Sequence, residues 1–431
     1  MKTILLEVNE INFTFIDKYI ELGELKNFKA LFEKHSYTKT IAENEQRNLE
    51  PWIQWVTVHT GKNFDEHKVF RLGDGVKDDV KQIWEVLEEK FDIDVAAISP
   101  MNAAAKAMNS AFFMPDPWSS DVVIGTWDLK LLFSAVKQIV NDNAKDKIEF
   151  SSYLKLAVGF IPNFRMKNVA KYIKLFYLSR KSKWYKAIFL DRILMDTFIT
   201  QWQRYQPDFS TLFLNAGAHI QHHYMYNSAV YEGVHENPNW YVDEDADPVL
   251  DLYREYDQIL GTINELDDVR LMICTALSQV PNPNMTYQYR LNQHGKFLTT
   301  LGIDYLEICP RMSRDFLVRF KNNDAAAQAQ NSLKQVKSID GTRIFSVDNR
   351  GDNLFCKIDY YGPLSGIQDL VFGEQIIKNF AAMISLASIE NGIHTTTGYF
   401  VDTGIEASLT KDEIKLAEVY DQIIGLYAAK P

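Results

Sequence analysis

Three of the nine histidines in this 431-residue chain lie close together, at His219, His222 and His223. They follow the apolar run LFLNAGA, which is typical of a buried strand. Imidazole binds zinc and also exchanges protons near neutral pH, so the cluster indicates a metal centre or an acid–base site. The alternative is that these imidazoles only hydrogen-bond the loop after the strand. No carboxylate lies between Asp208 and Glu232, so any acidic ligand must come from another part of the chain.

The elements that must position these histidines alternate between short apolar runs and amphipathic helices. The predicted strands are Thr3–Val8, Asp94–Pro100, Pro207–Ala218 and Val269–Ala276, and the predicted helices include Val80–Phe91 and Pro248–Leu266. This alternation predicts an α/β fold with a mainly parallel sheet flanked by helices. Ligands of such sheets bind beyond the carboxyl ends of the strands.

Polar residues follow two further predicted strands. At the end of the first strand, the two-residue alternation of side chains places Asn9 with Glu7 and opposite Glu10, and it favours Asn9 as the substrate-binding residue. Ser278 follows the fourth strand and is a second candidate for a hydrogen bond to substrate, although an uncharged loop residue is the ordinary interpretation.

Two segments interrupt the alternation. Residues 127–204 are helical, aromatic and basic and predict an inserted helical cap. Residues 285–366 mix strand-like and helix-like runs and predict a small α+β subdomain. The α/β core then comprises residues 1–126, 205–284 and 367–431. Near its end, Thr410 and Glu413 have the spacing of a capping box and predict a helix from there to about Tyr427.

Charge is unevenly distributed. Residues 155–192 contain ten Lys or Arg against one Asp, a local balance of +9 in a chain whose net charge is −11, which leaves −20 elsewhere. The acidic total argues against general nucleic-acid binding. Three interpretations of the basic segment stay open: a solvated helical face, a lid that gathers an anionic substrate, or a patch that contacts an anionic membrane or a lipid-linked glycan.

Composition narrows the class of protein. Hydrophobic residues make up 46% of the chain, which excludes a disordered protein. The opening apolar run is interrupted by Glu7 and Glu10, and no window approaches a membrane span. Cys274, Cys309 and Cys356 are far apart and odd in number, which fits reduced thiols. We therefore expect a cytoplasmic protein, with peripheral contact at the inner membrane through residues 155–192 as an option.

Four segments in the correct order resemble one family. ELGELKNFKALFEKH, PWIQWVTVHTGKNFDEHKVF, NAGAHIQHHY and GIHTTTGYFVDTG are similar to the motifs of the alkaline phosphatase superfamily, in its type I phosphodiesterase/nucleotide pyrophosphatase branch. The resemblance covers the predicted core and not the two inserted segments. It implies an enzyme in which two divalent metals, usually zinc, activate a Thr or Ser nucleophile.

Carried over residue by residue, the resemblance implies an altered site. The first-strand aspartate of the family falls on Asn9, and the nucleophile falls on Pro51 or Glu50, neither of which has a hydroxyl group. In the third motif the aspartate becomes Ala218, whereas the histidine is kept as His222. A later Asp-His pair becomes Leu277–Ser278, and the last histidine is kept as His394.

These matches imply at most one ordinary metal position. His222 and His394 would be its metal ligands, with His219 and Glu50 as replacements for the missing aspartate. The expected cofactor is therefore one divalent ion, zinc or manganese, or none.

The matched positions, the strand ends and the aromatic preference of binding sites together give the predicted roles. Glu50 and His222 are the predicted catalytic residues, and Asn9, Trp52, His219, Ser278 and His394 are the predicted substrate-binding residues. Two ordinary interpretations stay open beside these roles. Glu50 is also explained as an acid favoured at a helix start, and Trp52 as a helix–core contact.

Three functions fit this pattern. The first is an altered-site hydrolase or phosphodiesterase that acts on a phosphate-linked or sugar-nucleotide substrate. The second is a transferase in surface-glycan assembly at the inner membrane leaflet. The third is a non-catalytic protein that binds an anionic ligand on the same fold.

Overall fold

The computed structural model describes residues 1–43, 48–74, 80–104, 110–119, 122–143, 150–310 and 314–428. The chain divides into two compact units. The first comprises Met1–Lys137, Phe150–Pro281 and Gly392–Pro431, and the second comprises Gln138–Glu149 and Asn282–Asn391.

The main sheet lies in the first unit. Among the described residues its strand order is β17-β2-β16-β6-β1-β5-β3-β4. Five neighbouring strands are parallel to one another: β6 (Val269–Cys274), β1 (Lys2–Val8), β5 (Phe209–Leu214), β3 (Val95–Ile98) and β4 (Phe112–Met114). β16 (Thr397–Asp402) joins β6 in the antiparallel direction, and β2 (Thr38–Ile41) and β17 (Glu413–Lys415) complete that edge. The predicted mainly parallel α/β sheet is confirmed.

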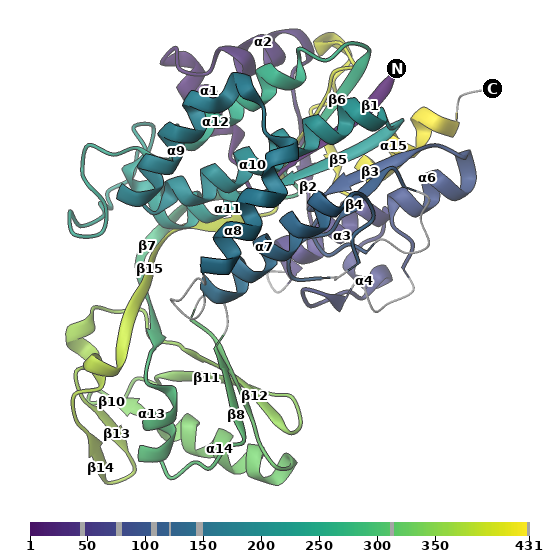
Figure 1. Ribbon diagram of the computed structural model, residues 1–431. Coiled ribbons are helices and arrows are strands. Elements are labelled where there is room, and N and C mark those ends of the chain that lie inside the picture. Colours follow the sequence, from purple (N-terminus) through teal and green to yellow (C-terminus); the bar gives the residue numbers. More distant parts are fainter. Residues whose placement is uncertain are drawn as a thin grey trace. The chain divides into compact units, whose positions relative to one another are not determined.

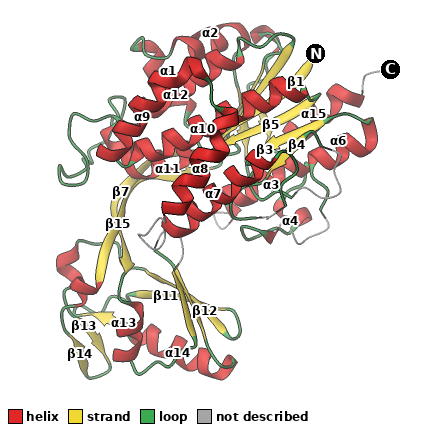
Figure 2. Cartoon of the chain, viewed as in Figure 1, coloured by secondary structure: helices red, strands yellow, loops and turns green. Residues whose placement is uncertain are grey.

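Helices cover both faces of this sheet (Figures 1 and 2). One face packs against α1 (Phe13–Glu21), α2 (Lys26–His35), α10 (Trp184–Tyr205), α11 (Ala216–Tyr224) and α12 (Pro248–Ile263). The other face packs against α3 (Pro51–Thr60), α6 (Ile83–Phe91) and α15 (Glu418–Ala428). The central strands are apolar because both of their faces are covered.

The inserted helical segment contains α7 (Trp127–Asn143), α8 (Phe150–Phe160), α9 (Val169–Lys181) and α10. It belongs to the first unit rather than to a separate body, apart from Gln138–Glu149. The reason is α10, whose Met195, Phe198 and Trp202 are buried in the same apolar cluster as strand residues of the sheet. α10 is therefore a core helix that leads into β5.

The second unit is a small α+β body. Its described strands form the antiparallel sheet β11-β12-β9-β8 (Phe345–Asn349, Asn353–Ile358, Phe316–Arg319 and Glu307–Pro310) and the sheet β10-β13-β14 (Lys337–Ser338, Leu370–Phe372 and Gln375–Ile377). Its longer helices are α13 (His294–Thr300) and α14 (Asn323–Gln335). The chain enters and leaves this unit through the paired strands β7 (Ser278–Leu291) and β15 (Ile384–Thr395).

The second unit extends beyond the predicted 285–366. Residues 367–391, expected in the core, belong to it because Ile367, Leu370 and Phe380 are buried in its own apolar cluster. The core therefore resumes at Gly392 rather than at residue 367.

The predicted capping box is also wrong. Glu413 begins a strand, β17, and the last helix begins only at Glu418. Every helix that the structure describes is too short or too polar to span a lipid bilayer.

Candidate metal centre

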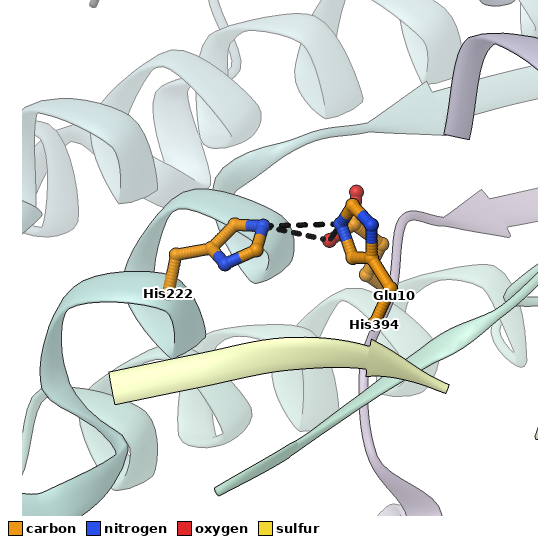
Figure 3. Close-up of side chains that lie close together, drawn as sticks. All are labelled: Glu10, His222 and His394. Carbon is orange, nitrogen blue, oxygen red and sulfur yellow. Dashed lines mark hydrogen bonds and ion pairs between the residues drawn. The ribbon is translucent and has the colours of Figure 1, made fainter. Parts of the chain in front are cut away.

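Three side chains from distant parts of the sequence meet beyond the carboxyl end of β1. They are Glu10, which follows β1, His222 on α11 and His394 on β15 (Figure 3). The Nε2 atoms of the two histidines are 3.1 Å apart. The Oε2 atom of Glu10 lies 3.3 Å from His222 Nε2 and 3.0 Å from His394 Nε2. Three potential ligand atoms thus form a small, nearly equilateral triangle.

Glu10 is held in place by its own backbone. It adopts φ 63°, a left-handed conformation that is uncommon for a residue with a side chain. Its N–H donates to Thr275 O, and its carbonyl oxygen accepts from Gln221 Nε2 and from the backbone N–H of Gln279. The Gln279 side-chain amide also donates to Oε2 of the carboxylate. In β1, successive side chains point to opposite faces of the sheet. The left-handed turn at Glu10 ends this alternation, and the carboxylate consequently faces the histidines.

Both histidines are oriented by backbone carbonyl groups. His222 Nδ1 lies 2.7 Å from Gly392 O, and His394 Nδ1 lies 2.7 Å from Leu49 O. A carbonyl oxygen only accepts hydrogen bonds, so each Nδ1 carries a proton and donates it. Each Nε2 atom therefore faces the Glu10 carboxylate. Histidines that bind metals are oriented in this way, through a hydrogen bond from the nitrogen that does not bind the metal.

The electrostatics keep Glu10 charged. Burial alone would raise the pKa of Glu10, but the adjacent His394 and His222 lower it below its ordinary value. Burial would lower the pKa of His394, but the Glu10 carboxylate raises it to about 9. In the absence of a metal ion, the pair therefore favours a protonated His394 beside a charged Glu10.

The spacing and chemistry of the three donors fit a divalent metal ion. Zinc–nitrogen and zinc–oxygen bonds of about 2.0 Å in a tetrahedron imply donor–donor distances of about 3.3 Å, close to the spacings here. Two imidazoles and one carboxylate suit zinc or manganese, and the same donor set also holds iron(II). Three protein ligands leave coordination positions open, which is the pattern of a catalytic rather than a structural site.

Access to these donors is one-sided. The Glu10 side chain is 2% exposed, whereas His394 is 18% and His222 is 31% exposed. The carboxylate therefore forms the floor of the site, and a ligand would approach over the two histidines.

The position of His222 depends on how α11 begins. The N–H groups of Asn215 and Ala216 donate to the carboxylate of Asp191 on α10, and the N–H of Gly217 donates to Tyr256 Oη. These bonds satisfy amides at the first turn, which otherwise lack helical partners. A Cβ atom on Gly217 would lie 2.5 Å from an Ile11 methyl carbon, so glycine lets α11 approach the end of β1. The predicted strand Pro207–Ala218 accordingly ends at Leu214.

Asp191 makes the stability of the protein depend on pH. Burial raises its pKa to about 7 from an ordinary 3.8, although Tyr256 and the two amides lower it. The native state therefore binds more protons than the unfolded state between these values, and Asp191 stabilises less as pH rises through that range. One pKa unit corresponds to about 1.4 kcal/mol, so we expect the stability difference between the wild type and Asp191→Asn to fall by at least about 2 kcal/mol from pH 4 to pH 8. Urea unfolding of both proteins across this range measures it. A difference independent of pH would contradict the prediction.

Asn9 and Ser278, two of the predicted substrate-binding residues, are engaged in hydrogen bonds within the protein. Asn9 Oδ1 accepts from Trp55 Nε1, and its amide donates to Asn215 Oδ1 and Glu10 Oε1. The Ser278 hydroxyl donates to Thr397 O at 2.6 Å. Among the described residues, Glu10, His222 and His394 form the group with metal-ligand spacing. The structure thus places Asn9 beside the site and commits Ser278 to the backbone, and substrate binding by either stays a prediction.

The other predicted site residues surround this group. Glu50 is the N-cap residue of α3, and its Oε2 lies 3.9 Å from His394 Nδ1. Trp52 is half-buried, and its indole N–H donates to Phe70 O. His219 lies on α11 one turn before His222, and its ring contacts that of His223, whose Nδ1 lies 3.1 Å from Tyr241 Oη. The structure brings Glu50 to the edge of the centre, whereas His219 is outside the set of three ligand atoms.

No protein-family model matches the chain. No curated protein matches it either. The fold is similar to phosphonoacetate hydrolase from Sinorhizobium meliloti 1021, with a TM-score of 0.46 and 9% identity over 99% of this chain and 96% of that one. It is also similar to human ectonucleotide pyrophosphatase/phosphodiesterase 5, with a TM-score of 0.42 and 9% identity over 100% and 96% of the two chains. A complex of the murine enzyme with AMP is similar to the same extent, with a TM-score of 0.42, 9% identity and the same coverage.

The fold and the site together define an α/β protein with a single candidate metal centre among its described residues. The functional argument rests on the side chains of that centre.

Proposed function

We propose that the protein is a hydrolase that uses one divalent metal ion and acts on a phosphate-linked small molecule. The observation that carries the proposal is the triangle of Glu10, His222 and His394, whose three donor atoms are 3.0 to 3.3 Å apart. Its open side and its buried carboxylate suit a cation that polarises a phosphoryl oxygen.

The residues around the centre suggest how hydrolysis would proceed. Among the described carboxylates outside the triangle, Glu50 lies beside it, 3.9 Å from His394 Nδ1, so it is the candidate base for a water molecule. Water oxygen would bond to phosphorus while its proton passes to Glu50 Oε2. The bond from phosphorus to the leaving oxygen would break, and that oxygen would take a proton from solvent. Pro51 follows Glu50 directly, so a covalent phospho-threonine intermediate has no hydroxyl here.

Substitution of Glu50 tests this assignment. We expect Glu50→Gln to lower kcat by about a hundredfold to ten-thousandfold, the range for loss of a general base, and to leave metal content unchanged. Steady-state hydrolysis of bis-p-nitrophenyl phosphate and metal analysis of the same preparations measure the two quantities. Glu43→Gln is a control, since it changes a second acid that lies before α3. Full activity in Glu50→Gln would remove Glu50 from the mechanism.

The substrate and the reaction type need a separate experiment. A panel of phosphodiesters, phosphomonoesters, phosphonates and sugar nucleotides would be incubated with protein loaded with zinc, manganese or iron(II). The proposal predicts release of the leaving group with water as the acceptor. Product formed only when a glycan or lipid acceptor is added would favour the transferase in surface-glycan assembly. Tight binding without turnover by every metal-loaded form would identify a binding protein.

A further inference from the structure

Helix α9 presents an apolar face to solvent. Val169, Ile173, Phe176 and Tyr177 are 41%, 67%, 55% and 56% exposed. Their spacing of four, seven and eight residues places them on one side of the helix. Met166 lies in the 3-10 turn just before α9 and is 75% exposed. We refer to these five residues as the α9 face.

The α9 face is part of a well-anchored helix. On the adjoining side of the helix, Tyr172 and Leu175 are buried, and the Tyr172 hydroxyl donates to the buried Asp196. Lys171 forms an ion pair with Glu255 of α12 at 3.0 Å. The outward apolar side chains are therefore a fixed surface feature of an ordered helix.

Basic side chains accompany the α9 face. Lys174, Arg180 and Lys181 lie on the same exposed part of the helix, and none of them has a carboxylate within ion-pair distance among the residues that the structure describes. Lys181 Nζ lies 4.5 Å from the centre of the Tyr177 ring, and the Arg180 guanidinium lies 5.9 Å from that of Phe176. Residues 155–190 contain no acid. A helix with exposed aromatic and aliphatic side chains among unpaired bases has the pattern of an interfacial helix.

We propose that the α9 face docks on an anionic lipid surface. Apolar side chains would enter the headgroup boundary while Lys174, Arg180 and Lys181 pair with lipid phosphates. A second copy of the chain is a poorer occupant, since two copies facing each other through α9 would bring like charges together. The −20 carried by the rest of the chain would be repelled by the same surface, and the molecule would bind in one orientation. This docking is independent of the chemistry at Glu10.

Vesicle co-sedimentation tests the proposal. The wild-type chain should bind vesicles of phosphatidylcholine mixed with phosphatidylglycerol and should not bind vesicles of phosphatidylcholine alone. About 0.5 M salt should release it, because exposed charges are screened at that ionic strength. Phe176→Ser with Lys181→Glu should lower the partition coefficient at least about tenfold.

The control variant is Leu22→Ser with Lys34→Glu, which also removes one exposed apolar side chain and reverses one exposed charge, both outside α9. It should bind as the wild type does. Circular dichroism would confirm that both variants fold. Equal binding to neutral vesicles, no binding to anionic vesicles, or an equal loss in the control would each overturn the proposal. So would a dimer, seen by analytical ultracentrifugation, that the α9 variant alone dissociates.

Discussion

Replacing Glu10 by glutamine should lower the affinity of the protein for zinc by roughly a hundredfold or more and abolish metal-dependent hydrolysis. Substitutions behind a metal ligand already cost about ten- to a hundredfold in affinity, so loss of the ligand itself should cost at least as much. Glutamine keeps the size of the side chain but removes the charge that draws a cation between His222 and His394. The neutral amide also places a donor where Oε2 now accepts from Gln279.

The matched control is Glu7→Gln. Glu7 is likewise a buried glutamate, but it lies within β1, where its Oε1 is 3.0 Å from His59 Nε2 and accepts from the Thr211 hydroxyl. These two partners of Glu7 are not among the three candidate ligands. We expect this variant to lose stability and to keep one metal ion per chain, whereas Glu10→Gln should keep none.

Stability provides a second readout of the Glu10 variant. A ligand present at a hundred times its Kd stabilises a protein by about 2.7 kcal/mol. Zinc should therefore stabilise the wild type and Glu7→Gln by about this amount, and a chelator should reverse the effect. At the same zinc concentration, Glu10→Gln should gain only about 0.4 kcal/mol or less. Titration calorimetry that shows wild-type affinity in Glu10→Gln would exclude the proposed centre and, with it, the proposed function.

The sheet was predictable because helices cover both of its faces. Strands that are buried on both faces are short, nearly continuous apolar runs, and these can be recognised in the sequence. His222 and His394 were predicted from motif order, and the structure places their Nε2 atoms together. Glu10 was not favoured, because regular alternation points it away from Asn9. The left-handed φ of Glu10 breaks that alternation, and such a turn after a strand leaves no reliable trace in the residue type.

The supports of the centre were less predictable still. Gly392 and Leu49 act through their backbone carbonyl groups, so their side chains do not indicate the role. Asp191 lies in a basic segment that suggested an exposed cap, yet it is buried against the start of α11. Thr410 and Glu413 have capping-box spacing, but pairing of β17 with β2 overrides this local preference. In each case a contact between residues distant in sequence decides the outcome.

Replacing Arg192 by methionine should destabilise the first unit by about 3–5 kcal/mol. Arg192 is 1% exposed on α10, and its guanidinium bonds to Glu255 Oε1 of α12 and lies 3.6 Å from Asp196 Oδ1. Methionine fills a similar volume but leaves both buried carboxylates with less compensating charge. The cost is large because a buried charge without its partner loses solvation and gains nothing in return.

All eight tryptophans lie in the first unit, so selectively excited tryptophan fluorescence during urea unfolding reports on that unit. Lys171→Met is the matched control, because Lys171 also pairs with Glu255 but its side chain is 22% exposed. Because the Lys171 ammonium reaches solvent and Glu255 keeps Arg192, we expect a smaller loss than in Arg192→Met. If the free energy of unfolding of Arg192→Met is within about 1 kcal/mol of the wild-type value, the network tolerates an unpaired charge. Equal losses in the two variants would mean that burial of the arginine adds nothing. A larger loss in Arg192→Met than in Lys171→Met would show that Arg192 is the residue that fixes α10 to α12. Asp191, the next residue on α10, can then hold the start of α11, and with it His222, against the end of β1.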